Sequence, residues 1–450
     1  MYRPFHTHHY VITMSIAPAI VPLRIGMFGG GVVGGGVYEI LMQRGVATLR
    51  RPVVISKICV RNLDKPRSFT IDESQTTLTT DPNDILEDSE IDCVVEVMGG
   101  IGLAKQVVLD SLKAGKSVVT ANKALLAAHL DECHDAAKST KKELAYEAAV
   151  CGGIPIIQVL QSCYDGDVIT NVSGICNGTT NYMLTAMEDG ADYATVLQEA
   201  QDLGFAEADP TADVEGHDVR AKIAILAKLA FGQTVSVDDI PTAGISNIQA
   251  VDFEYAALLH STIKLVGTAR RLTGVDGDDA NSSPLSVYVS PVMVSTKDML
   301  ASTRGSGNAI VVTSENMNAC SYTGPGAGRF PTANSVVADI VRVANGQASV
   351  DPFPKVSPEP LELEDNYVSP FYVRIPFRDG LGIIRQTGEL AERHGVSIHA
   401  ILQNPIADPG SADFCVTTDP CPLSNVQAFC NDLAAQNFCR DPPLHMPLLR

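Results

Sequence analysis

The part of the sequence best equipped for chemistry is an acidic segment that ends in a lysine. Gly216 is suited to begin a helix, and on that helix Asp218 and Lys222 are four residues apart, so both side chains project from one face. An exposed ion pair at this spacing would stabilise the fold only weakly. The stretch upstream is rich in carboxylates that could accept hydrogen bonds from the ammonium group of a substrate. These carboxylates belong to Glu207, Asp209, Asp213 and Glu215.

A second lysine follows a short apolar strand. Ser117–Thr120 is predicted to be a buried strand, and Lys123 comes soon after it. Ligands bind at the carboxyl ends of the strands of a parallel sheet, so Lys123 is predicted to face a bound ligand. A plain surface position is the alternative, because lysines are mostly exposed. Gly99 follows the preceding predicted strand, 92–97, at the same edge of the sheet.

A glycine-rich loop near the start of the chain is suited to a dinucleotide. Gly29, Gly31 and Gly34 form the pattern G-x-G-x-x-G between a predicted strand, Leu23–Phe28, and a helix. The backbone N–H groups of such a loop, together with the helix N-terminus, can bind a pyrophosphate. The motif alone is weak, because a glycine-rich turn without a ligand has the same pattern and further glycines surround it.

The residue after the second strand distinguishes the two nicotinamide dinucleotides. A carboxylate there binds the ribose hydroxyls of NAD, whereas an arginine can pair with the 2′-phosphate of NADP. The second predicted strand is 53–60, and Arg61 follows it, with Lys65 and Arg67 close by. We therefore expect NADP as the cofactor, with NAD possible. A solvated basic loop is the alternative interpretation.

Two cysteines offer a different chemistry. A nucleophilic cysteine beside a nicotinamide would make the protein an acylating aldehyde dehydrogenase, which passes through a thioester. Cys151 and Cys176 are the candidates, but neither belongs to a motif that pairs it with a histidine base, so we expect both to be passive. A non-catalytic nucleotide sensor is a further alternative, although a sensor has no need of the pair formed by Asp218 and Lys222.

Composition narrows the class of protein. The chain has 450 residues, of which 45% are hydrophobic, and its formal net charge of -19 argues against a nucleic-acid partner. Its 11 cysteines lack the paired spacing of zinc sites. Reduced thiols fit a cytoplasmic protein best. No apolar run is long enough to cross a membrane, so we expect no membrane partner.

The order of predicted elements divides the chain into units. Strands and helices alternate over residues 21–150, which is typical of an α/β protein with a Rossmann-like, doubly wound parallel sheet. Residues 151–350 are predicted to form an α+β domain. We expect residues 1–20 to be a disordered extension, and the true start of translation stays open. Helices are expected at 37–44, 105–114, 193–203 and 219–231.

A small unit is predicted at the end of the chain. Residues 351–366 are rich in proline and acidic side chains, which indicates a linker. Residues 367–450 follow with the order β-α-β-β-α-β, a ferredoxin-like unit. This unit resembles an ACT domain. Leu381 stands where the ACT family has the proline of its Asp-x-Pro-Gly turn, so this turn departs from the family pattern.

Several motifs together resemble the homoserine dehydrogenase family, in its monofunctional form with a C-terminal ACT-like domain. They occur in the family's order and span nearly the whole chain, so agreement by chance is negligible. The resemblance implies the NAD(P)H-dependent, reversible reduction of L-aspartate 4-semialdehyde to L-homoserine, in threonine and methionine biosynthesis. The motifs lie at 29–34, 120–123, 147–155, 177–182, 207–222, 324–328 and 331–339.

The resemblance implies roles for particular residues in the reaction. Lys222 and Lys123 would be the catalytic lysines, with Asp218 beside them. A lysine suits this reaction, because it can donate a hydrogen bond and then a proton to the oxygen as hydride reaches the aldehyde carbon. Which lysine delivers the proton stays open. The substrate would contact Glu207, Asp213, Gly178, Thr180 and Tyr182.

The same resemblance implies binding sites for a cofactor and a cation. Sodium or another monovalent cation would be bound by the carboxylate of Glu147 and the backbone carbonyls of Val150, Gly152 and Ile154, although a glycine turn at a strand end explains these residues without a metal. A homodimer or larger homo-oligomer and a threonine effector at the ACT-like domain are also implied. The cofactor-binding residues would be Gly29, Gly31, Val32, Val33, Gly34, Arg61, Lys65, Gly99, Thr120, Lys123 and Gly326.

Overall fold

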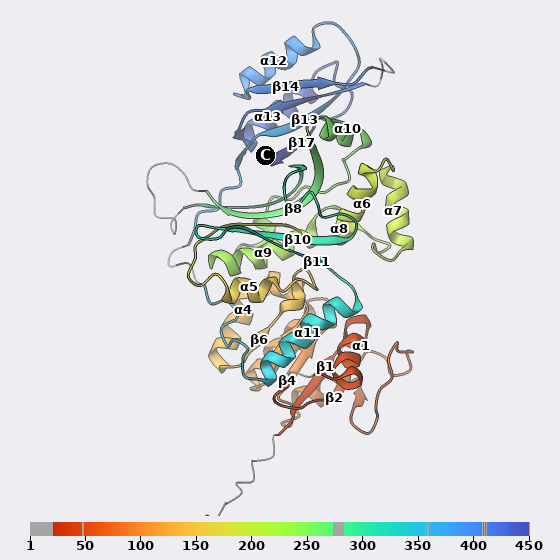
Figure 1. Cartoon of the computed structure of the whole chain (residues 1–450), viewed down its shortest axis with the longest axis vertical. Coiled ribbons are helices and arrows are strands. Elements are labelled where there is room, and N and C mark those ends of the chain that lie inside the picture. Colours follow the sequence, from red (N-terminus) through yellow and green to blue (C-terminus); the bar gives the residue numbers. More distant parts are fainter. Residues whose placement is uncertain are drawn as a thin grey trace, which may run out of the picture.

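The computed structural model arranges the chain as three units stacked along its long axis, with the N-terminal unit at one end and the C-terminal unit at the other (Figure 1). The expected extension at 1–20 lies outside the residues that the structure describes. Among the described residues, no helix combines the length and the apolar character needed to cross a bilayer. The described residues are 21–46, 49–272, 283–355, 357, 360–406, 408, 410 and 412–449.

The first unit is built on a six-stranded parallel sheet in the order β3-β2-β1-β4-β5-β6. This confirms the predicted Rossmann-like sheet. The strand order reverses between β1 and β4, so the carboxyl ends of these two strands form the switch point at which ligands bind. The strands are β1 (Leu23–Phe28), β2 (Val53–Cys59), β3 (Thr77–Thr79), β4 (Cys93–Glu96), β5 (Ser117–Thr120) and β6 (Leu144–Ala145).

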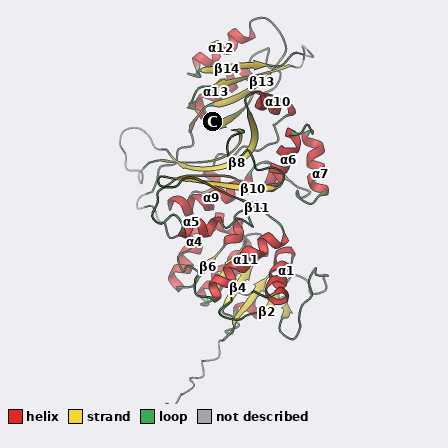
Figure 2. Ribbon diagram, viewed as in Figure 1, coloured by secondary structure: helices red, strands yellow, loops and turns green. Residues whose placement is uncertain are grey.

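Helices cover both faces of this sheet (Figure 2), as an all-parallel sheet requires. One face packs against α3 (Gly102–Lys113) and α4 (Lys123–Thr140), and the other against α1 (Val32–Tyr38), which continues as a π-helix. The second face is completed by α11 (Arg329–Ala344), from far along the chain. A helix from the range expected for the central domain therefore packs as part of the first unit. The π-helix is Glu39–Arg44, and the short α2 is Asn83–Leu86.

Two helices of the first unit differ from expectation. The helix after the glycine-rich loop begins at Val32 instead of residue 37, and α4 falls where the sequence analysis assigned no helix. Glycine disfavours helix, but here close packing decides. A Cβ atom at Gly36 would lie 2.8 Å from the Cβ of Ala333, and one at Gly35 would lie 2.7 Å from the Phe69 ring. The extra glycines let α1 approach its neighbours.

The central unit places helices against antiparallel strands. Helix α9 packs on β7, β8 and β9, and α6 packs on β8 and β10. The strands are β7 (Ile169–Ile175), β8 (Ser261–Arg271), β9 (Leu285–Ser295), β10 (Gly307–Ser314) and β11 (Asn318–Pro325). The helices are α5 (Ile156–Ser162), α6 (Gly178–Glu188), α7 (Tyr193–Asp202), α8 (Thr211–Val214), α9 (His217–Phe231) and α10 (Ala250–Leu258), with single 3-10 turns at Glu147–Ala149 and Val237–Asp239.

The C-terminal unit has the predicted βαββαβ order. Its strands are antiparallel in the order β17-β13-β15-β14, the ferredoxin-like arrangement, and a short pair, β12 and β16, lies beside them. Its elements are β12 (Val368–Ser369), β13 (Phe371–Phe377), α12 (Ile383–Arg393), β14 (Ile398–Gln403), β15 (Ala412–Thr418), β16 (Cys421–Pro422), α13 (Leu423–Ala434) and β17 (Leu444–Leu449).

The C-terminal unit is joined to the central unit through the sheet itself. Leu448 and Leu449 of β17 pair in parallel with Met293 and Val294 of β9, which makes one nine-stranded sheet. The described part of the expected linker is also anchored, because Phe353 is fully buried. The three units are therefore held together by backbone pairing and apolar packing.

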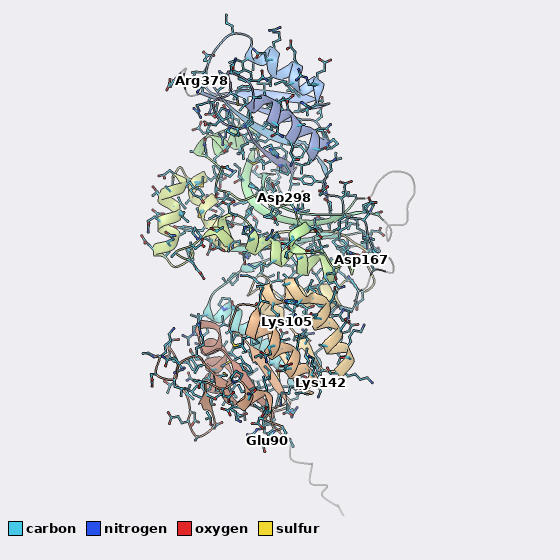
Figure 3. The ribbon with its side chains drawn as sticks, turned by 180° about the vertical axis from the view of Figure 1, so that it is seen from behind. Glu90, Lys105, Lys142, Asp167, Asp298 and Arg378 are labelled. Atoms are coloured by element: carbon cyan, nitrogen blue, oxygen red, sulfur yellow. The ribbon has the colours of Figure 1, made fainter. Side chains whose placement is uncertain are left out.

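The view from behind shows which edge of the first sheet meets the rest of the molecule (Figure 3). Lys105, at the start of α3, lies toward the central unit, whereas Glu90 and Lys142 lie toward the far end. The start of α3 follows the carboxyl end of β4. The carboxyl edge of the sheet, where ligands bind in this fold, therefore faces the central unit.

Candidate active site

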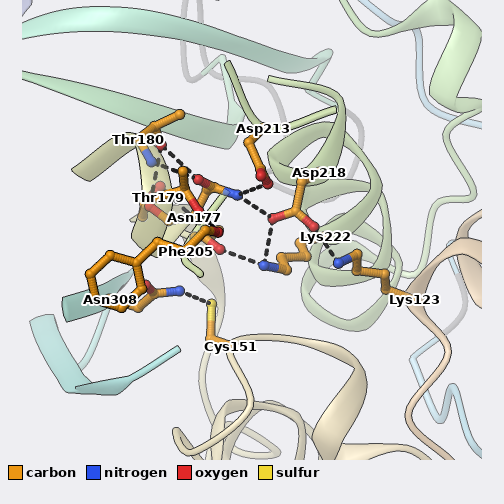
Figure 4. Close-up of polar contacts among 12 residues, drawn as sticks. Lys123, Cys151, Asn177, Thr179, Thr180, Phe205, Asp213, Asp218, Lys222 and Asn308 are labelled. Carbon is orange, nitrogen blue, oxygen red and sulfur yellow. Dashed lines mark hydrogen bonds and ion pairs between the residues drawn. The ribbon is translucent and has the colours of Figure 1, made fainter. Parts of the chain in front are cut away.

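The Asp218 carboxylate is the centre of a buried polar cluster at the start of α9 (Figure 4). Lys222, one helical turn later, donates from Nζ to Asp218 Oδ2 over 2.7 Å and to the backbone carbonyl of Cys176 over 2.5 Å. Asp218 and Lys222 are each only 7% exposed. The predicted helix therefore holds both residues on one face, but that face is buried instead of exposed.

Lys123 reaches the same carboxylate from the first unit. Its Nζ lies 2.5 Å from Asp218 Oδ1, and its side chain remains 44% exposed. Lys123 is the first residue of α4, whose start is capped by the side chain of Asn122 through the N–H of Leu125. The structure thus brings together the three residues that the sequence analysis named as catalytic.

Asn177 organises the acidic side of this cluster and was not among the predicted site residues. Its amide donates to Asp213 over 2.7 Å and to Asp218 over 2.9 Å, while its carbonyl oxygen caps α6 by accepting from the N–H of Thr180. An asparagine before a helix is a plain N-cap signal. Only the folded chain shows that the same side chain also bridges two carboxylates.

Charge compensation determines the protonation of the cluster. Burial alone would raise the pKa of Asp218, but Lys222 and Lys123 hold it well below its usual range. Burial would lower the pKa of Lys222, and Asp218 more than offsets this, so the lysine stays an ammonium ion. Burial raises the pKa of Asp213, despite the hydrogen bond from Asn177. The site therefore offers two ammonium groups around one firmly ionised carboxylate.

The two candidate nucleophilic cysteines lie next to this cluster and contact each other. Cys151 is 1% exposed and Cys176 is 0% exposed. The Cys176 thiol donates to the Gly174 carbonyl over 3.7 Å, and the Asn308 amide donates to Cys151 over 3.4 Å. The interaction between the two thiols, with help from Lys222 and Asn308, lowers the pKa of Cys151 and raises that of Cys176. Among the described residues, their hydrogen-bond partners include no histidine, and their burial is that of packed side chains.

The glycine-rich loop occupies the switch point of the first sheet. The N–H of Gly29 donates to the carbonyl of Cys59, and a Cβ at Gly34 would lie 2.1 Å from the carbonyl oxygen of Gly29, so the loop and α1 are in close contact. At Gly31, by contrast, no atom of the residues that the structure describes lies within 4 Å of the position of a Cβ. The open side of Gly31 is suited to the close approach of a pyrophosphate.

A buried carboxylate that the sequence analysis missed braces the neighbouring loops. Glu96, at the end of β4, is 0% exposed and accepts from the N–H of Met98 over 2.8 Å and from the hydroxyl of Thr120 over 2.7 Å. Asn122 then donates to the carbonyl of Gly100 over 2.6 Å. These bonds fix the glycine turn after β4 against the start of α4, which carries Lys123.

The basic residues of the loop after β2 fall into two groups, one that bonds to the loop backbone and one that faces solvent. The guanidinium of Arg67 donates to the backbone carbonyls of Asn62, Leu63 and Lys65, so it shapes the loop. Arg61 and Lys65 have exposed side chains. The loop therefore leaves two cationic groups facing solvent beside the switch point.

The segment expected to bind a cation is built from buried oxygen atoms. The Glu147 carboxylate accepts the N–H groups of Ile157 and Gln158, and burial, with nearby Asp339, raises its pKa to about 7. The carbonyl of Gly152 accepts from the Ser335 hydroxyl, and that of Ile154 accepts from the N–H of Ile156. In the described part of the chain, no three His, Cys, Asp or Glu side chains gather as metal ligands. A cation here would depend mainly on carbonyls.

The predicted substrate contacts lie around α6. Gly178 begins that helix and Tyr182 follows one turn later, with its ring 5.2 Å from the ring of Phe205. The carbonyl of Phe205 accepts from the Thr179 hydroxyl over 2.7 Å, which anchors the loop that carries the exposed Glu207.

Two further residues of the predicted site, Thr180 and Gly326, are in close contact with neighbouring asparagines. Both polar groups of Thr180 bond to Asn177, so Thr180 supports the helix cap. Gly326 packs against Asn308, where a Cβ would lie 2.1 Å from the amide nitrogen.

A Rossmann-like sheet whose switch point faces a carboxylate and two lysines defines an oxidoreductase that uses a nicotinamide dinucleotide. A model of the homoserine dehydrogenase NAD binding domain matches residues 29–147, and the homoserine dehydrogenase model matches residues 155–341. Homoserine dehydrogenase of Corynebacterium glutamicum is 39% identical over 406 residues, which is 87% of this chain and 90% of that protein. Its Bacillus subtilis relative is 39% identical over 395 residues, or 85% and 88%.

The solved structures agree with the sequence relatives. The crystal structure of a homoserine dehydrogenase from Thiobacillus denitrificans has a TM-score of 0.86 and 32% identity, covering 95% of this chain and 98% of that chain. The chain therefore belongs to the homoserine dehydrogenase family and is an NAD(P)-dependent oxidoreductase. An acylating dehydrogenase and a non-catalytic sensor are set aside by this finding.

The difference between Gly31 and Gly34 gives a test of the nucleotide loop. Gly31→Ala should fold normally but weaken NADPH binding at least about tenfold, because its methyl group meets no protein atom and instead occupies space needed by the ligand. Gly34→Ala should lower the melting temperature, because its methyl group meets the loop backbone. Calorimetry for binding and thermal melting check both, with the exposed Gly166→Ala as control. Unchanged affinity in Gly31→Ala would contradict this location of the site.

Proposed function

We propose that Lys123, Lys222 and Asp218 carry the reduction of L-aspartate 4-semialdehyde to L-homoserine, and its reverse. The observation that carries this proposal is the Asp218 carboxylate held between two ammonium groups, one from each of the units that meet at the switch point. A bound reduced nicotinamide would supply hydride to the aldehyde carbon, and negative charge would develop on the aldehyde oxygen. Ammonium groups beside that oxygen stabilise the charge by hydrogen bonding.

The two lysines differ in how they can serve the oxygen. Lys222 uses two of its three N–H donors on Asp218 and the Cys176 carbonyl, which leaves one for the substrate. Its raised pKa favours a lasting hydrogen-bond donor over a group that gives up its proton. Lys123 is half exposed and can exchange protons with solvent. We therefore assign charge stabilisation to Lys222 and proton delivery to Lys123.

The substrate's charged end is proposed to bind on the α6 side of the cluster. Glu207 and Asp213 supply carboxylates for its ammonium group, and the loop carrying Glu207 is anchored to α6. Gly178 and Tyr182 border the same region from the start of α6. Thr180 is proposed to act through Asn177, since its N–H and hydroxyl are both bonded there.

The cofactor is proposed to lie along the carboxyl edge of the first sheet. The loop residues Gly29, Gly31, Val32, Val33 and Gly34 would bind the pyrophosphate. Further along the same edge, the nicotinamide end would meet Gly99, Thr120, Lys123 and Gly326. The exposed Arg61 and Lys65 would pair with the 2′-phosphate of NADP, and this is the basis for proposing NADP over NAD.

A monovalent cation, sodium in the first instance, is proposed at Glu147, Val150, Gly152 and Ile154. The donor set fits, because hard cations prefer oxygen ligands and the carbonyls of Gly152 and Ile154 each keep a second lone pair beside their present hydrogen bonds. The bound ion would stabilise the turn that leads into α5. Sodium chloride should therefore raise the melting temperature more than choline chloride at equal ionic strength, and an equal effect of both salts would count against the site.

We also propose a pathway, a compartment, an effector and an oligomeric state, on the basis of the family and the fold. The enzyme would serve threonine and methionine biosynthesis in the cytosol, a compartment that suits its 11 free cysteines. The ferredoxin-like C-terminal unit would be an ACT domain with threonine as effector, and the central sheet would form a homodimer. Threonine titration of the activity and sedimentation equilibrium address these two proposals.

Removal of the buried ammonium tests the catalytic assignment. Lys222→Met should reduce kcat by about 10²- to 10⁴-fold, the range for losing a positioned proton or charge donor, with NADPH affinity little changed. Lys228→Met is the matched control, because Lys228 is also buried on α9 but lies near Asp131, away from the cluster. Steady-state kinetics and a binding titration measure both. Near-normal turnover in a folded Lys222→Met protein would refute the assignment.

A charge reversal tests the cofactor preference. Arg61→Asp should shift the ratio of kcat/KM for NADPH over NADH toward NADH by roughly 10- to 100-fold, because a carboxylate repels the 2′-phosphate and can bind ribose hydroxyls. Lys113→Asp makes the same charge change on the exposed face of α3 and serves as control. If both variants keep the parental ratio, the basic loop does not select the cofactor.

A further inference from the structure

A buried ion pair joins the C-terminal unit to the central unit. Arg374, on β13, is 3% exposed, and its Nε donates to Asp252 Oδ1 of α10 over 2.8 Å. The Tyr372 hydroxyl donates to the same oxygen over 2.8 Å. Asp252 is 0% exposed, so its charge is compensated by the C-terminal unit and not by water. Figure 1 shows α10 lying between β13 and the helices α6 and α8.

The same arginine also holds the segment that leads into α10. Arg374 Nη2 donates to the backbone carbonyl of Asn247 over 3.0 Å. The second oxygen of Asp252 accepts from the N–H of Gln249 over 2.8 Å. A planar guanidinium can bond to the Asp252 carboxylate and the Asn247 carbonyl at once, whereas an ammonium group lacks that fixed geometry. Arg374 therefore fixes the segment 244–249, directly at Asn247 and through Asp252 at its end.

The other side of this segment is bonded to the turn between α8 and α9. The N–H of Ile245 donates to the carbonyl of Val214 over 2.8 Å, and the Ser246 hydroxyl donates to the Glu215 carboxylate. The segment 244–249 and the turn are in close backbone contact, because a Cβ at Gly244 would lie 2.3 Å from the carbonyl oxygen of Val214. A shift of the segment 244–249 must therefore move the turn.

That turn joins the two helices that carry the acidic residues of the active site, Asp213 on α8 and Asp218 on α9. Asp213 directly precedes Val214, and its backbone carbonyl accepts from the N–H of Gly216 over 3.0 Å, while its carboxylate accepts from Asn177. Asp218 follows two residues after Gly216. The bonded path thus runs from Arg374 in the C-terminal unit, through the segment 244–249, to the carboxylates around the catalytic lysines.

We propose that Arg374 is a positioning residue for the reductase site: by fixing the segment 244–249 it sets the place of Asp213 and so the binding of the aldehyde substrate. This inference rests on the proposed role of Asp213 as a substrate contact. The C-terminal unit is then a structural part of the site. A ligand that moved β13 would act on the same turn.

The positioning role of Arg374 can be tested separately from the attachment of the C-terminal unit, because a second connection also attaches that unit. The pairing of β17 with β9 holds the C-terminal unit to the central sheet without Arg374. Loss of the arginine therefore leaves this pairing in place, while it releases the segment 244–249 and breaks an ion pair with Asp413 inside the C-terminal unit. A structural tie alone would change the melting temperature but not the kinetic constants of the folded protein.

The test compares variants along the path in the full-length enzyme. Arg374→Met removes the bonds to Asp252 and Asn247 together with the ion pair to Asp413, and Arg374→Lys keeps the charge. Ser246→Ala removes the bond to Glu215 in the middle of the path, along with an exposed contact to Tyr193, without disturbing the buried pair. Arg393→Ala is the control, because it breaks an exposed ion pair with Asp432 in the same unit. For each variant, the KM for aspartate semialdehyde, the KM for NADPH, kcat and the melting temperature are measured.

We expect Arg374→Met to raise the KM for the aldehyde about tenfold and Ser246→Ala a few-fold, with the KM for NADPH unchanged and Arg374→Lys between wild type and Arg374→Met. Arg393→Ala should match wild type. An unchanged aldehyde KM in folded Arg374→Met overturns the proposal, and if that variant does not fold, an unchanged KM in Ser246→Ala overturns it. Asp213→Asn separates the two claims. If it leaves the aldehyde KM unchanged while Arg374→Met raises it, the substrate role of Asp213 fails, and the effect of Arg374 on the turn stands without passing through Asp213.

Discussion

The Asp218 carboxylate, held between ammonium groups from two different units, is the interaction on which the rest of the structure depends. A buried carboxylate is costly unless it is paired and hydrogen-bonded, and here Lys222, Lys123 and Asn177 share that task. Lys222 comes from the same helix, but Lys123 must be delivered by the nucleotide-binding unit. The electrostatics of one side chain therefore constrain how two units sit against each other.

The nucleotide-binding unit delivers Lys123 to Asp218 from the carboxyl edge of its parallel sheet. The buried Glu96 holds Thr120 and the glycine turn after β4, and Asn122 caps the helix that presents Lys123. The close contact between Gly34 and Gly29 brings α1 to the same edge. The nucleotide loop and Lys123 thus share one set of backbone supports, so the proposed hydride donor and proton donor would be positioned together.

On the side away from the nucleotide-binding unit, the cluster is supported by chain segments that have no proposed catalytic residue. The cap formed by Asn177 fixes α6, and the turn between α8 and α9 is bonded to the segment that precedes α10. Arg374 closes this set of contacts from the C-terminal unit. Because β17 extends the central sheet, that unit shares a continuous backbone framework with the site. The contacts that support the cluster therefore come from all three units, although the Asp218 carboxylate and its two ammonium partners lie at the junction of two.

The sequence by itself predicted most of the local elements of the first unit, though not β3, α2 or α4, and it offered the residue types of the site. Continuous apolar runs identified the strands β1, β2, β4 and β5, because a parallel sheet buries both faces, and the spacing of Asp218 and Lys222 placed them one helical turn apart. Tertiary structure alone decided that this pair is buried, that Asn177 bridges two carboxylates, and that α11 covers the first sheet. Those features depend on contacts between residues far apart in the chain. Periodicity reports which face of an element is apolar, but it carries no information on which distant segment will cover that face.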